Sequence, residues 1–116
     1  MANLYITEYA HFGALQARTG RGGGAFDAIP LAREPASVEQ KVAFTSAISA
    51  AAFGSTTTLV RLVADAGCHI KITPAATVLN DGATAATAAH QYIPSGAVEW
   101  RAVSPGDVLS VYDGTT

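Results

Sequence analysis

Apolar and polar positions alternate with a period of two through much of the chain, which is the pattern of half-buried β-strands. Successive side chains of a strand point to opposite faces of its sheet, so each run can bury one face. The runs with this pattern are 4–9, 38–44, 68–73 and 98–103, and strands are also predicted at 58–64, which is rich in β-branched residues, and at 108–112. About seven or eight short strands with closely spaced turns predict an all-β fold, an antiparallel β-sandwich with a jelly roll as a variant.

Turn residues separate these runs. Glycine, proline and aspartate favour tight turns, and they cluster at 65–67, 80–82, 94–96 and 104–107. The first of these turns predicts that the strands on either side of it form a hairpin. Two segments stay ambiguous: 47–53 fits a short helix or a small-residue strand, and 83–89 fits a helix or a loop.

Residues 11–36 break the alternation. The segment is rich in glycine and proline, which disfavour regular elements. It also holds three of the five arginines, Arg18, Arg21 and Arg33. Long irregular stretches in compact domains are usually functional or disordered. We expect an extended arm or long loop that orders on contact with a neighbour, with a floppy surface loop as the alternative, and a main sandwich over 37–114.

The composition points to buried surfaces. The chain has 116 residues, enough for a single domain (1–116), and charged residues make up 14% of it against a typical value of about 25%. Arginine outnumbers lysine five to two, as in permanent interfaces. These features indicate a surface that is covered with Ser, Thr, Gly and Ala, a surface that is largely buried against partners, or both. We expect a homo-oligomer, a dimer or trimer. The net charge of −2 and the lack of a basic cluster argue against a nucleic-acid partner.

Nothing in the sequence predicts targeting to a membrane. The first residues lack the basic start and apolar run of a signal peptide. The apolar runs are far shorter than the roughly 20 residues that span a bilayer. We therefore expect a soluble chain in a reducing compartment, with Cys68 as a small buried residue.

The sequence carries no recognisable catalytic or cofactor motif. The glycine run at 20–24 lacks the Gly-Lys-Ser/Thr signature and a following helix. His11, His69 and His90 have no partner at a metal-ligand spacing. The carboxylates are scattered, and no Gly-x-Ser-x-Gly elbow occurs. We expect no enzyme activity, no metal and no cofactor.

Trp100 alternates with apolar residues, so the sandwich core is the first expectation for it, with a sugar-stacking platform or an interface anchor as alternatives. Arg61 and Arg101 lie on predicted strands between apolar residues, exposed or paired across a subunit boundary. The interface candidates are Arg18, Arg21, Phe26, Arg33, Arg61, Trp100 and Arg101.

Several strings resemble small virion proteins of tailed phages, including the capsid cement (decoration) proteins. They are the opening segment 1–9, the runs 37–43 and 58–65, and the ending from 92–94 through 104–111. The resemblance covers most of the chain and rests on pattern rather than on a catalytic signature.

The resemblance implies a β-sandwich or jelly-roll subunit that is made in the host cytoplasm and is located on the capsid surface of the virion. It also implies a symmetric oligomer that binds the major capsid protein at junctions between its subunits and stabilises the head. The alternative is a tail, head–tail or surface glycan-binding module of the virion.

Overall fold

The computed structural model describes residues 2–10, 12–18, 26–32 and 35–114, the second and third of these ranges by their backbone. The strands and the helix of these residues are β1 (Ala2–Tyr9), β2 (Phe12–Arg18), β3 (Phe26–Ala32), β4 (Val38–Phe44), β5 (Ile48–Ser49), β6 (Leu59–Ala64), β7 (Cys68–Thr73), α1 (Ala75–Asp81), β8 (Gln91–Ile93), β9 (Val98–Ala102) and β10 (Val108–Asp113).

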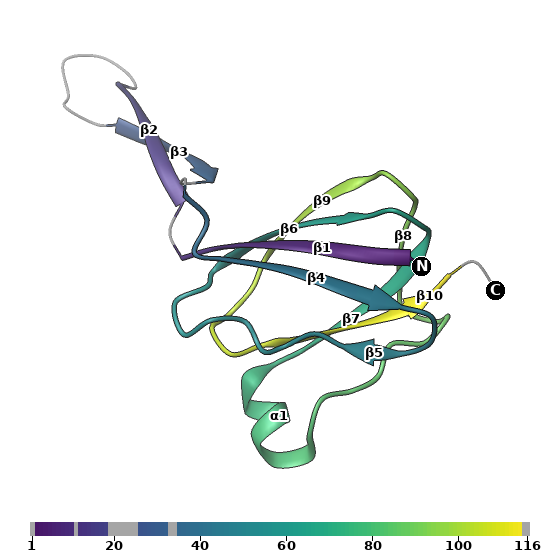
Figure 1. The fold of residues 1–116 in the computed structure, drawn as a ribbon. Coiled ribbons are helices and arrows are strands. Elements are labelled where there is room, and N and C mark those ends of the chain that lie inside the picture. The colour runs from purple at the N-terminus through teal and green to yellow at the C-terminus, as the bar shows by residue number, and fades with distance from the viewer. Residues whose placement is uncertain (1, 11, 19–25, 33–34, 115–116) are drawn as a thin grey trace.

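Two four-stranded antiparallel sheets form the body of the protein (Figure 1). Their strand orders are β4-β1-β6-β9 and β5-β10-β7-β8. The predicted all-β, sandwich-like fold is therefore confirmed, while the jelly-roll variant stays a prediction. Within the described residues, no helix is long and apolar enough to cross a membrane.

The core lies between the two sheets and follows the alternation of the sequence. In β6, every second residue is buried, ending with Leu62 and Ala64. Leu109 and Val111 of β10 are buried from the opposite sheet, and Phe44 belongs to the same cluster. Alternate burial of this kind explains why β-branched and aliphatic residues fill the inward positions of both sheets.

The hairpin predicted around residues 65–67 is wrong. β6 pairs with β1 and β9, whereas β7 pairs with β10 and β8. The 65–67 connection therefore carries the chain from one sheet to the other. It is held by the backbone N–H of Asp65, which donates to the Asn3 carbonyl at 3.1 Å, and by the Gly67 carbonyl, which accepts from Gly114 N–H at 3.0 Å. Leu62 of β6 and Ile70 of β7 are buried in the same core cluster, so the two strands face each other across the core.

The helix α1 was not predicted from the sequence. Pro74 follows the last residue of β7 and is the N-cap position of a helix that continues to Asp81. Proline suits a helix start because the first amides have no partner within the helix. Gly82 ends the helix with a φ of 79°, where glycine avoids the steric penalty of a side chain. Residues 83–89 form no helix, and the strand alternative holds for 47–53 through β5.

The 11–36 segment is also more regular than predicted. β2 and β3 pair with each other over seven positions, from Phe12↔Ala32 to Arg18↔Phe26. Figure 1 shows this hairpin projecting from the sandwich, between β1 and β4. Both strands of a two-stranded ribbon are edge strands, which is where a proline such as Pro30 is tolerated.

Candidate functional site

The outward-facing side of the β4-β1-β6-β9 sheet carries a group of aromatic and basic side chains. We call this group the outer aromatic face, and its members are Tyr5, Tyr9, Lys41, Arg61, Val98 and Trp100. Tyr5, Val98 and Trp100 rank among the exposed large apolar residues of the structure.

Trp100 is not in the core, so the first expectation for it is wrong. It is 45% exposed, because it pairs across strands with Arg61, whose neighbours in β6 point inward. Its indole lies 5.9 Å from the ring of Tyr9, at an interplanar angle of 32°. Tyr9 is 4% exposed. Trp100 therefore lies across β6 against Tyr9 and keeps part of its own surface open to solvent.

Arg61 lies between two cross-strand neighbours, Thr7 on β1 and Trp100 on β9. It is half-buried, and no hydrogen bond or ion pair joins its guanidinium to another residue in the part of the chain that the structure describes. Lys41 lies nearby, with its Nζ 5.8 Å from the centre of the Tyr5 ring. A shallow groove of about 530 Å³ includes Tyr5, Lys41 and Arg61 in its lining. An unpaired guanidinium beside aromatic rings suits binding of a carboxylate or another planar acceptor group.

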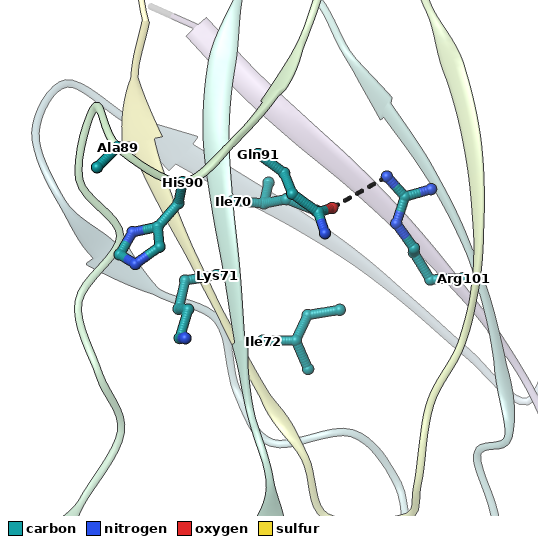
Figure 2. A pocket seen from close by; sticks show the side chains of 7 residues that line it. All are labelled: Ile70, Lys71, Ile72, Ala89, His90, Gln91 and Arg101. Atoms are coloured by element: carbon teal, nitrogen blue, oxygen red, sulfur yellow. Dashed lines mark hydrogen bonds between the residues drawn. The ribbon is translucent and has the colours of Figure 1, made fainter.

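Arg101 faces away from this surface and is paired within its own chain. Its guanidinium donates to the Glu99 carboxylate at 3.2 Å, to the Gln91 side-chain oxygen at 3.1 Å and to the Trp100 carbonyl at 3.0 Å. Figure 2 shows the contact with Gln91, which joins β9 to β8 of the other sheet. Arg101 therefore ties together two edge strands of the sandwich.

A second groove, of about 360 Å³, lies at this edge (Figure 2). Its lining includes Lys71, His90 and Arg101 and no carboxylate. His90 Nδ1 accepts a hydrogen bond from the backbone N–H of Thr87 at 2.9 Å, so a neutral His90 carries its proton on Nε2. The lining contains no Ser, Thr or Cys side chain.

The described residues contain no cluster of three or more His, Cys, Asp or Glu side chains that could hold a metal ion. Cys68 is fully buried, as predicted. Burial, followed by the charge of Asp113, raises the pKa of the Cys68 thiol to about 11. The thiol is therefore protonated at neutral pH and is a poor nucleophile.

Sequence reasoning missed the fully buried Glu8. Its side chain accepts hydrogen bonds from Gln40 Nε2 at 2.6 Å, Gly54 N–H at 2.9 Å and the Thr57 hydroxyl at 2.8 Å. The signal was present, because Glu8 follows Leu4 and Ile6 at the same two-residue spacing. A carboxyl group in phase with core residues predicts buried donors around it.

The other interface candidates lie in the hairpin segment. Arg18 and Phe26 pair with each other at the far end of β2 and β3, whereas Arg21 and Arg33 lie outside the described residues. The structure thus brings the candidates together in two pairs, Arg18 with Phe26 and Arg61 with Trp100.

No family model, curated protein or solved structure matches this chain.

Proposed function

We propose that the protein is a non-enzymatic capsid cement (decoration) protein of a phage, which binds the major capsid protein at subunit junctions and stabilises the head. The observation that carries the proposal is the β2–β3 hairpin, which projects from a compact sandwich (Figure 1). A projecting hairpin can add a strand to a neighbour or fill a groove on it. Many such contacts over a particle add avidity, even when each contact is weak.

The hairpin can be removed without cutting into the sandwich. The backbone N–H of Ser37 donates to the Glu8 carbonyl at 2.8 Å, so the strands on either side of the hairpin already lie together. Ala10 belongs to the body, because its carbonyl accepts a hydrogen bond from the Thr58 hydroxyl at 3.2 Å. A suitable variant therefore replaces residues 11–36 with a short linker containing Asn-Gly, which favours a tight turn.

The test has two steps. Quantitative mass spectrometry first counts copies of the chain in purified particles, and the proposal expects a large number in a simple ratio to the major capsid protein. The deletion variant is then added to particles that lack the protein. We expect it to keep the urea midpoint of the parent and to lose particle binding. The double variant Arg18→Ala/Phe26→Ala is a milder test of the same contact, because it changes only the far end of β2 and β3.

Three outcomes of these experiments would argue against the proposed function. Unchanged binding by the folded deletion variant contradicts the proposed role of the hairpin. A dozen copies or fewer per particle moves the protein to the tail or the head–tail junction, and absence from particles removes the virion role altogether.

A surface glycan-binding module is the second candidate, and exposed Trp100 favours it, because sugars stack on open aromatic faces. Trp100→Ala should then abolish binding on a glycan array. Tyr92→Ala is the matched control, because Tyr92 is 52% exposed but belongs to the other sheet. The glycan-binding function is excluded if both variants lose glycan binding equally, or if the parent protein binds no glycan.

A further inference from the structure

Strand β9 ends the β4-β1-β6-β9 sheet and pairs with β6 on one side. No described strand pairs with its other side. Two apolar residues of this edge strand, Val98 and Trp100, are among the exposed large apolar side chains. An open edge with exposed apolar residues favours pairing with another strand.

The hydrogen bonds of β9 show which residues face the open edge. Val103 N–H donates to the Thr58 carbonyl at 3.0 Å, and in antiparallel sheets alternate residues bond to the same neighbour. Glu99 and Arg101 therefore bond to β6, while the backbone groups of Val98, Trp100 and Ala102 point to the open edge. The contact of the Arg101 guanidinium with the Trp100 carbonyl agrees with this assignment.

The residues of β9 are arranged symmetrically about Trp100, in the order Val-Glu-Trp-Arg-Ala. We infer that two copies of the chain associate by pairing their β9 strands in antiparallel fashion, with a two-fold axis at Trp100. This register places Glu99 opposite Arg101 of the partner subunit, and Arg101 opposite Glu99 of the partner subunit. Trp100 faces its own copy as a hydrogen-bonded pair, which is the kind of pair that its edge-facing backbone requires.

The charges of β9 are compatible with this antiparallel pairing of two copies. In the single chain, Glu99 and Arg101 pair with each other at 3.2 Å, and their side chains are 35% and 29% exposed. On association, the Trp100 carbonyl accepts from the backbone of the partner subunit, and Arg101 is released to reach the partner's Glu99. Opposite charges directly across an antiparallel pair are favourable, and like charges are unfavourable.

The interface is small. A five-residue strand pair buries much less than the roughly 1,600 Å² of a standard interface, so the dimer should form in a concentration-dependent way. The association needs no capsid protein and can be measured on the purified chain. Its failure would leave the proposed cement role untouched, because that role rests on the hairpin.

The experiment is sedimentation velocity over a range of protein concentrations, with two charge variants, Glu99→Arg and Arg101→Glu. Each variant places like charges opposite each other at both symmetric positions, so each should weaken the dimer about tenfold. An equimolar mixture restores opposite charges at both positions and should form a heterodimer with the affinity of the parent. The double variant Glu99→Arg/Arg101→Glu should recover a homodimer.

Fluorescence gives an independent readout, because Trp100 is the one tryptophan of the chain. Its emission should shift to shorter wavelength as the parent dimerises and should not shift in the single variants. Three results would overturn the inference: a parent protein that stays monomeric throughout, single variants that dimerise as tightly as the parent, or a mixture that recovers no affinity. Recovery in the mixture also shows that both variants are folded.

Discussion

Removing the buried side chain of Glu8 should destabilise the protein strongly. Glu8→Ala deletes the acceptor of three hydrogen bonds and leaves Gly54 N–H and the Thr57 hydroxyl without it. Thr57 is fully buried, and a buried donor that loses its acceptor costs about 1–3 kcal/mol. Glu8→Ala leaves two such donors but also removes the cost of burying a carboxyl group. We therefore expect the free energy of unfolding to fall by about 3 kcal/mol.

Glu8→Gln should be much milder. Its amide oxygen can still accept from Gly54 and Thr57. Its amide nitrogen then faces the Gln40 side chain, which can turn its own oxygen toward it at the expense of a long 3.5 Å contact with the Ala51 carbonyl. We expect a loss of about 1 kcal/mol, the value of one typical hydrogen bond.

Urea unfolding of the three proteins measures these differences directly, with equal m-values as the sign that the same transition is compared. A loss of about 3 kcal/mol is readable against a total stability of about 5–15 kcal/mol for a domain. Glu39→Ala is the matched control, because Glu39 is exposed on β4 and should change stability by less than about 0.5 kcal/mol. If Glu8→Ala and Glu8→Gln lose equal stability, the buried donors do not depend on Glu8 and the reasoning is refuted.

Three further outcomes are expected from other parts of the structure. Cys68 should react with a thiol reagent at the rate of unfolding, because it is buried and its pKa is raised to about 11; fast labelling in native buffer would contradict its burial. Gly67→Ala should displace Tyr92, because a Cβ there would overlap the Tyr92 hydroxyl, and Tyr92→Ala should recover most of the lost stability in urea unfolding. The backbone and side-chain hydrogen bonds from Asn3 lower the pKa of Asp65 below 3.8, so its contribution is present above about pH 4 and is lost as pH falls through the lowered pKa. The urea midpoint of the parent should therefore exceed that of Asp65→Ala by more at pH 6 than at pH 2.

The strands of the sandwich could be predicted because their alternation is local. Burial of every second residue leaves a direct trace in the sequence, as in β7, where buried Cys68 and Ile70 alternate with the less buried His69. Pairing leaves no such trace, and the turn at 65–67 looks the same whether it joins paired strands or crosses between sheets. Helix α1 escaped prediction because it has no buried residue, so no apolar face marks it. The strands β2 and β3 were not predicted because their segment is rich in glycine and proline, which disfavour strands. An open two-stranded ribbon tolerates these residues, because both of its strands are edge strands.

The exposure of Trp100 shows why the candidate site could not be predicted without the strand pairing. A period of two tells which residues of β9 share a face, and Val98, Trp100 and Ala102 form the more apolar set, which by itself favours the core. Residues directly opposite each other in a sheet lie on the same face, and Trp100 is opposite Arg61. β6 buries Leu62 and the other residues of the face opposite Arg61, so Arg61 and the residue paired with it face outward. The pattern of β6, and not that of β9, therefore determines that the tryptophan is exposed.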